Sequence, residues 1–329
     1  MTHARGRGGP WKTKERPVKE QPERPPTVLP ADGERLGLAD REGFLAWVFL
    51  LPSVVYIIAL VGVPFLLAIA FAFSDVTTGD PSYDFIGFRN FRSIFDDDIF
   101  WRSLVNTLIF TVVSMALIVV FGKILANILV ADFRGKWFVR LLVLLPWTTP
   151  VALSSISWLW MLDSIYSPID WALREAGTIE TNMHWLGRPS LAMISVIAVH
   201  VWRLTPLAAI IVMAGLVAIP KDIDEAARID GAGFWRRMFE VTIPLTLPVI
   251  AVAALFGAIV TFTDMTVVYI LTRGGPTDST QVLASWAYFR GIEGGDVGQG
   301  AAIALFLFPI LLGGVIAILR AVRRLEVLS

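Results

Sequence analysis

The sequence contains no cysteine and only three histidines among its 329 residues. Without cysteine the chain has no disulfide, no thiolate metal site and no thiol nucleophile. Three histidines also leave little material for a metal centre built from several imidazoles. Charged residues are scarce as well, at 17% of the chain. We therefore predict no catalytic residues, no metal ion and no cofactor.

Polar surface is the second thing the chain lacks. Hydrophobic residues make up 55% of the sequence, and the mean hydropathy is +0.66. A water-soluble domain of this size needs more polar surface than that. The formal net charge is zero, so no excess of basic residues indicates binding to nucleic acid. The composition predicts a polytopic protein whose surroundings are the lipid bilayer.

The N-terminal part differs from the rest of the chain. Residues 1–43 are rich in proline, arginine, lysine and glutamate, a composition that predicts a disordered tail. The first apolar run begins at Phe44, too far along the chain for the apolar core of a cleavable signal peptide. We therefore expect two regions, a cytoplasmic tail over 1–43 and a membrane domain over 44–329.

Apolar segments long enough to cross about 30 Å of hydrocarbon recur along the membrane domain. They predict an all-α protein with six transmembrane helices, over Phe44–Phe73, Leu104–Ala131, Val139–Leu162, Ser190–Val217, Leu245–Leu271 and Gly298–Leu319.

The placement of lysine and arginine predicts the orientation of these spans. With the N-terminus inside the cell, nineteen of the 28 basic residues fall in the tail and the inner segments, and seven fall in the outer segments. Cytoplasmic segments of membrane proteins carry such an excess of positive charge. Both termini, and the segment between the fourth and fifth spans, are therefore expected in the cytoplasm.

The segment between the fourth and fifth spans contains the pattern that says most about function. Glu225-Ala226-Ala227 is followed after three residues by Gly231, and about a dozen residues later by Ile243-Pro244. This pattern resembles the docking loop of permease subunits in binding-protein-dependent importers driven by ATP, which have the type I ABC importer permease fold. The family has Ile and Leu where this chain has Val241 and Ile243, a conservative difference.

The resemblance implies that a cytoplasmic docking loop over 219–244 receives the force of ATP hydrolysis from a partner. Its contact residues would be Glu225, Ala226, Ala227, Asp230 and Gly231. The residues alone leave open an ordinary amphipathic inner loop.

Helical spacing continues beyond the glycine of this loop. Phe234, Met238 and Val241 share one helix face, which predicts a second short helix seated on the membrane ends of the spans. Arg236 and Arg237 are expected to face outward.

Further motifs narrow the resemblance to one branch of the family. They are Phe85-Ile86-Gly87-Phe88-Arg89-Asn90-Phe91, Leu145-Pro146-Trp147 and Leu271-Thr272-Arg273-Gly274-Gly275-Pro276. Together they are similar to the carbohydrate-uptake branch, and specifically to its maltose-type first permease subunit. The implied location is a bacterial or archaeal inner membrane.

Partners follow from the same resemblance. The chain has no Gly-x4-Gly-Lys-Ser/Thr loop that could cradle the phosphates of ATP. The resemblance therefore implies two separate ATPase subunits, a second homologous permease subunit and an extracytoplasmic substrate-binding protein. A membrane-embedded enzyme and a self-sufficient secondary transporter are the rival classes. The first lacks an evident catalytic constellation, and the second needs no docking loop.

Two ionisable residues at membrane depth indicate where a substrate could pass. Such groups are costly in the bilayer and face the interior of a helix bundle. Arg203 lies near the middle of the fourth span, and Asp264 lies in the outer half of the fifth. His200 and Leu207 share the helix face of Arg203, and Gly257 and Thr261 share that of Asp264.

By position, these faces match the sugar-contacting segments of the maltose-type family, with Trp147 and Val151 in the third span. The implied substrate path is Trp147, Val151, His200, Arg203, Leu207, Gly257, Thr261 and Asp264. The family has asparagine and apolar residues where this chain has His200 and Arg203, which argues against maltose itself.

Two alternatives remain for the charged pair at this stage. Arg203 and Asp264 could bind each other, or the partner permease, and hold helices together without touching substrate. Arg203 could instead attract a phosphate or carboxylate, which would make the substrate a glycerol phosphate ester or another anionic small molecule.

Overall fold

The computed structural model describes residues 42–80 and 83–328, so most of the expected tail lies outside the described residues. The described chain is helical and contains no strand, apart from one isolated antiparallel bridge between Ser74 and Phe85. The prediction of an all-α protein is confirmed. Helix α1 (Glu42–Ile57) begins two residues before the first expected span.

The chain divides into two compact units, residues 1–58 and 59–329. The described part of the first unit is α1 and Ile58, the first residue of the π-helical turn η2 (Ile58–Gly62). The other helices all belong to the second unit. They are α2 (Val63–Ala72), α3 (Arg89–Phe95), α4 (Asp98–Val130), α5 (Lys136–Thr148), α6 (Val151–Met161), α7 (Pro168–Glu175), α8 (Pro189–Val217), α9 (Lys221–Ile229), α10 (Phe234–Arg237), η3 (Met238–Thr242), α11 (Ile243–Thr263), α12 (Thr266–Leu271), α13 (Leu283–Tyr288), η4 (Phe289–Glu293) and α14 (Val297–Leu328).

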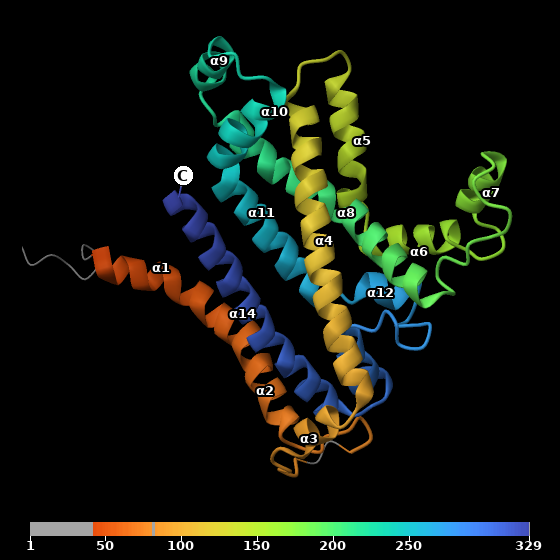
Figure 1. The fold of residues 1–329 in the computed structure, drawn as a ribbon. Coiled ribbons are helices and arrows are strands. Elements are labelled where there is room, and N and C mark those ends of the chain that lie inside the picture. Colours follow the sequence, from red (N-terminus) through yellow and green to blue (C-terminus); the bar gives the residue numbers. More distant parts are fainter. Residues whose placement is uncertain (1–41, 81–82, 329) are drawn as a thin grey trace, which may run out of the picture. The chain divides into compact units, whose positions relative to one another are not determined.

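Six spans are present among the described residues when the bent pair of α5 and α6 counts as one. The five unbroken runs are Ala46–Ala72, Asp98–Val130, Pro189–Val217, Phe234–Thr263 and Val297–Arg324. In the second unit, α9, α10 and the connection between α4 and α5 lie at one end, and α3 lies at the opposite end (Figure 1). This arrangement puts two of the segments expected to face the cytoplasm on the same end of the bundle.

The third span is broken, whereas we expected one helix over Val139–Leu162. Helices α5 and α6 meet at an angle of 96°. Thr149 is extended, with φ −74° and ψ 134°, and Pro150 follows it at φ −53° and ψ 130°. Proline disfavours the helical conformation of the residue before it and donates no backbone hydrogen bond. The Thr149-Pro150 pair therefore accounts for the break.

The fifth span differs from the expected Leu245–Leu271 at both ends. Its helical run begins at Phe234 and ends at Thr263, because Asp264 is extended with φ −76° and ψ 118°. The Oδ1 atom of Asp264 accepts hydrogen bonds from the backbone N–H groups of Thr266 (2.7 Å) and Val267 (3.4 Å). Asp264 thus closes α11 and satisfies the first donors of α12.

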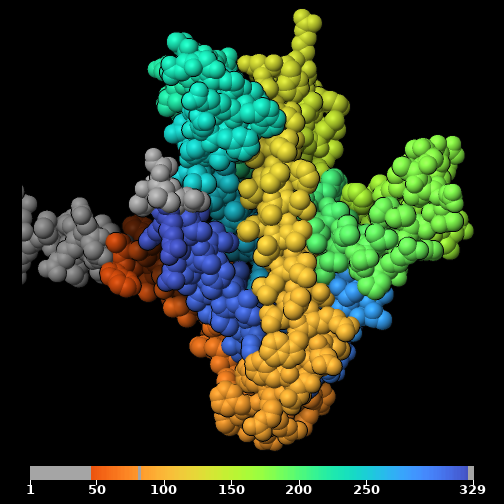
Figure 2. Space-filling model, in the orientation of Figure 1, coloured from red at the N-terminus to blue at the C-terminus, as the bar shows by residue number. Residues whose placement is uncertain are grey.

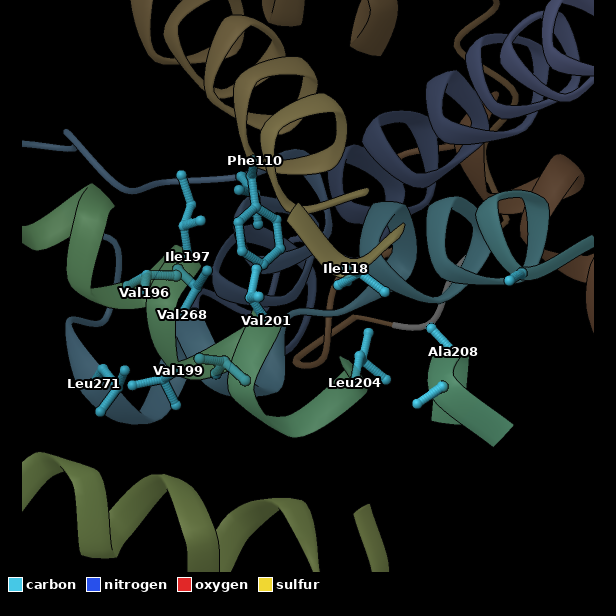
Figure 3. Close-up of a cluster of buried hydrophobic side chains, with 14 of the residues drawn as sticks. Phe110, Ile118, Val196, Ile197, Val199, Val201, Leu204, Ala208, Val268 and Leu271 are labelled. Carbon is cyan, nitrogen blue, oxygen red and sulfur yellow. The ribbon is translucent and has the colours of Figure 1, made fainter. Parts of the chain in front are cut away.

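The most extensive contact between two helices joins α4 and α8. Phe110 and Ile118 of α4 meet Leu204 and Ala208 of α8 in a buried apolar cluster (Figure 3). The two backbones approach closely at Gly122, where an added Cβ atom would lie 2.8 Å from the Cβ of Ala208. Since lipid tails are as apolar as these side chains, close packing of this kind holds membrane helices together.

Replacing Gly122 with valine should therefore lower the thermal stability of the purified protein. The new side chain forces α4 away from α8, and overpacking of this kind costs about 1–3 kcal/mol. Differential scanning fluorimetry in detergent measures the change in Tm. Gly314→Val in α14 is the matched control, because nothing lies within 4 Å of a Cβ atom at that position. Equal Tm values for the two variants would contradict the close approach of α4 and α8.

A second apolar cluster lies where α4 begins and α13 and α14 meet. Phe100, Trp286 and Ile303 are buried in it. Nearby, the Nδ2 atom of Asn106 donates to the carbonyl oxygens of Asp278 (3.1 Å) and Gln281 (3.0 Å). These bonds fix the segment after α12 against α4, at the end of the bundle opposite α9.

Candidate functional site

The expected docking loop contains a short, well-terminated helix, α9. Acidic residues lie in its first turn and Arg228 lies in its last, which suits the helix dipole. Gly231 adopts φ +74°, and Ala232 N–H donates to the carbonyl of Ala227 over 3.0 Å. This is the left-handed glycine closure common at helix ends. The chain can therefore leave α9 sharply at Gly231 and turn back toward α10.

The residues expected to contact a partner lie on the surface. Glu225, Ala226, Asp230 and Gly231 are exposed, and Ala227 is half-buried. Among the described residues, Glu225 makes no hydrogen bond or ion pair. Ile229 is 87% exposed on the same helix. The segment that includes α9 is coloured teal in Figure 2, where it lies at the surface of the second unit.

The two arginines after the turn behave differently, and the expectation that both face outward was wrong for one of them. Arg236 is exposed and pairs with Glu240 over 2.8 Å. The side chain of Arg237 is only 20% exposed and pairs with Asp224 of α9 over 3.0 Å. Helix α10 also continues through η3 into α11, so the expected second short helix is the beginning of the fifth span.

The apolar residues expected on one face of α10 and η3 are only partly buried. Met238 and Val241 are half-buried, as their spacing predicts, but Phe234 is 58% exposed. Phe234 instead packs edge to face on Trp235, with ring centroids 5.2 Å apart. An exposed aromatic pair therefore stands next to α9.

At membrane depth, the two ionisable residues bind each other. The Nη2 atom of Arg203 donates to Oδ2 of Asp264 over 2.5 Å. The exposed fractions of the two side chains are 11% and 8%. Of the two alternatives for Arg203, the ion pair within the chain is therefore the one present in this structure.

His200 and Thr261 extend this pair into a network. His200 Nδ1 lies 3.4 Å from Oδ2 of Asp264, and Nε2 lies 2.9 Å from Oγ1 of Thr261. The hydroxyl of Thr261 donates to the carbonyl of Gly257 over 2.7 Å. Because that hydroxyl has one hydrogen, His200 must donate from Nε2. Phe110 covers the imidazole, with ring centroids 4.8 Å apart.

The eight residues of the expected path thus fall into three groups. His200, Arg203, Gly257, Thr261 and Asp264 are joined by the hydrogen bonds above and by the contact between His200 Nδ1 and Asp264. Leu207 shares a narrow crevice with Gly257, between α8 and α11. Trp147 and Val151 flank the bend between α5 and α6 and pack against the buried cluster of α4 and α8.

Two contacts were not predicted from the sequence: the hydrogen bond between His200 and Thr261 and the ion pair between Asp224 and Arg237. The first joins residues 61 positions apart, and the second joins residues 13 positions apart across a turn. Helical spacing placed His200 on the same face of the fourth span as Arg203, and Thr261 on the same face of the fifth span as Asp264. Spacing within one helix does not show which faces of two helices meet.

Known proteins similar to this chain include transport components. Residues 118–326 match the family described as binding-protein-dependent transport system inner membrane component. The chain is 32% identical to the trehalose/maltose transport system permease protein MalF of Thermococcus litoralis, over 86% of this chain and 95% of the relative. It is 31% identical to the sulfoquinovosyl glycerol transport system permease protein SmoG of Agrobacterium fabrum, over 90% of this chain and 95% of the relative.

A solved structure shares the fold. The crystal structure of a bacterial ABC transporter involved in the import of the acidic polysaccharide alginate matches with a TM-score of 0.75 and 21% identity. The match covers 88% of this chain and 99% of that one. The expected importer permease fold is confirmed.

Proposed function

Because the chain belongs to the family of binding-protein-dependent transport system inner membrane components, we propose that it is the permease subunit of a sugar importer driven by ATP. The family match over residues 118–326 is the observation that carries this proposal. Related permeases of similar length are named for trehalose and maltose, sulfoquinovosyl glycerol and diacetylchitobiose. Sugars and sugar derivatives are therefore the favoured class of substrate.

The proposed partners follow from the family and from α9. As an inner membrane component, the chain is a permease and not a catalytic protein, and it works with a substrate-binding protein outside the membrane. We assign ATP hydrolysis to two separate subunits, and the other half of the translocation path to a second homologous permease. The exposed Glu225, Ala226, Asp230 and Gly231, with Ala227 beside them, form the contact with an ATPase subunit. This contact lies in the cytoplasm, as do both termini.

The substrate path runs along the faces of α8 and α11 and the bend between α5 and α6. Trp147 is only half-buried at that bend, so one aromatic face can stack on a sugar ring. The network of His200, Arg203, Thr261 and Asp264 holds α8 against the end of α11 beside it. We assign this network to the wall of the path together with Leu207, Gly257 and Val151.

The ion pair bears on the choice between a neutral and an anionic substrate. An anion would need a guanidinium that is free to bind it, but Arg203 already binds a carboxylate over 2.5 Å. Breaking that pair would leave a buried charge without its counter-ion. The geometry therefore favours a neutral sugar over glycerol phosphate esters.

A direct uptake assay tests the proposed substrate class. The complex purified with its own binding protein is reconstituted in proteoliposomes with internal ATP, and uptake of radiolabelled trehalose, maltose and diacetylchitobiose is measured beside glycerol 3-phosphate. We expect at least one sugar to be taken up and glycerol 3-phosphate to be excluded. Uptake of glycerol phosphate alone would overturn the sugar assignment.

A further inference from the structure

Helix α9 is attached to α10, and so to the fifth span, by a pliable connection. The four residues between α9 and α10 are Asp230, Gly231, Ala232 and Gly233, and two of them are glycines. Glycine populates conformations that other residues avoid, so this connection transmits little force by itself. Helix α9 also makes no extensive packing contact with any other helix in the described part of the chain. Side-chain contacts must therefore link motion of α9 to motion of the fifth span.

One ion pair makes such a link. Both carboxylate oxygens of Asp224 accept hydrogen bonds from Nη1 of Arg237, over 3.0 and 3.3 Å. Asp224 precedes Glu225 on α9, and Arg237 ends α10, which continues without interruption into the fifth span. The pair thus joins the proposed docking helix to a membrane-spanning helix by a charge-assisted contact.

Each partner of this pair is held in position by its own surroundings. Arg228, one turn along α9, donates to the Asp224 carboxylate from Nε over 2.9 Å. The side chain of Arg237 is 20% exposed, and its Nε atom is buried without a hydrogen-bond partner among the described residues. A cavity of about 170 Å³ adjoins the pair, bordered by Asn127 of α4 and Thr242 of η3. Arg237 therefore lies at the junction of α9 with two membrane helices.

We propose that the ion pair between Asp224 and Arg237 is the strut through which movement of α9 reaches the fifth span. This inference rests on the proposed function, because it assumes that an ATPase subunit moves α9. Asp224 and Arg237 are positioning residues in this role and touch no substrate. The side chain of Asp224 is 46% exposed, and an ion pair with a solvent-exposed partner contributes little to folding stability. Loss of the strut should therefore impair coupling and leave the complex assembled.

The residue next to Arg237, in the helix that continues into the fifth span, offers a matched control. Arg236 pairs with Glu240 over 2.8 Å, and this pair lies entirely within the fifth span's own helix. Replacing Arg236 with glutamine removes the same charge one residue away without touching α9.

The test uses the complete complex in proteoliposomes and measures three quantities: sugar uptake, ATP hydrolysis and recovery of the ATPase subunits on purification. For Asp224→Asn and Arg237→Gln we expect the uptake per ATP hydrolysed to fall about fivefold or more, with recovery of the ATPase subunits unchanged. Arg236→Gln should stay within about twofold of the wild type. The reversed pair, Asp224→Lys with Arg237→Glu, should regain most of the lost coupling.

Three outcomes would overturn the strut. They are unchanged uptake per ATP in Asp224→Asn, an equal loss in Arg236→Gln, or loss of the ATPase subunits from both Asp224→Asn and Arg237→Gln, which would make the pair a docking contact. Failure of the proposed function is distinguishable, because then the wild-type chain itself recovers no ATPase subunit.

Discussion

Replacing Asp264 with alanine should destabilise the protein by about 3–5 kcal/mol, because the change leaves the Arg203 guanidinium buried without its counter-ion. Only 11% of the Arg203 side chain is exposed, so little water can replace the lost carboxylate. The carboxylate also accepts the backbone N–H groups that open α12, and alanine cannot. A lower Tm of the purified protein in detergent, together with lost sugar uptake, is the expected result.

A double variant separates stability from transport. Arg203→Met with Asp264→Asn removes both charges, and asparagine keeps an oxygen that can accept the N–H of Thr266. Removing both partners of a buried pair is often neutral, so the double variant should recover most of the lost Tm. If the double variant recovers both Tm and sugar uptake, the role of the ion pair is to hold α8 against α11. If the double variant recovers Tm but not sugar uptake, the pair belongs to the substrate path. An unchanged Tm in Asp264→Ala would contradict the buried pair itself.

Replacing Glu225 with lysine should abolish transport without affecting insertion or folding. Glu225 is exposed and makes no ion pair among the described residues, so reversing its charge breaks no contact within the chain. A charge reversal at an interface places like charges together and costs several kcal/mol of binding. We expect uptake to fall more than about tenfold and the ATPase subunits to be lost or uncoupled.

Asp132→Lys is the matched control for Glu225→Lys. Asp132 lies in the connection between α4 and α5, at the same end of the bundle as α9 (Figure 1), and its side chain is 90% exposed. The change in net charge is identical, and no residue of α9 is replaced. Asp132→Lys also removes the exposed pair of Asp132 with Lys136 (2.6 Å), which contributes little to stability. Wild-type uptake in Glu225→Lys, or an equal loss in Asp132→Lys, would count against α9 as the docking helix.

The sequence predicted the features that depend on local patterning. Long apolar segments identified all six spans, since each must be apolar over its whole length wherever it packs. The end of α9 could also be anticipated, because Gly231 is needed for the left-handed closure after it. The break at Thr149-Pro150 was missed. Proline inside an apolar segment is compatible with a continuous helix, as at Pro206 of α8, or with a full break.

The sequence predicted which residues belong to the candidate site better than it predicted which of them are in contact. Arg203 and Asp264 stand out in any apolar span, and their pairing was one of the alternatives considered. The orientation of Arg237 was not predictable. It depends on α9 folding back across two glycines until Asp224 comes within 3.0 Å, and spacing along one helix cannot show such a fold.

The most direct test of the central claim is purification of the tagged chain from its native cells in mild detergent, with identification of the proteins that accompany it and measurement of their ATPase activity. We expect a second permease and a nucleotide-binding subunit to co-purify, with ATP hydrolysis that rises when the binding protein and a sugar are added. A chain that purifies alone and transports sugar by itself after reconstitution would contradict the account.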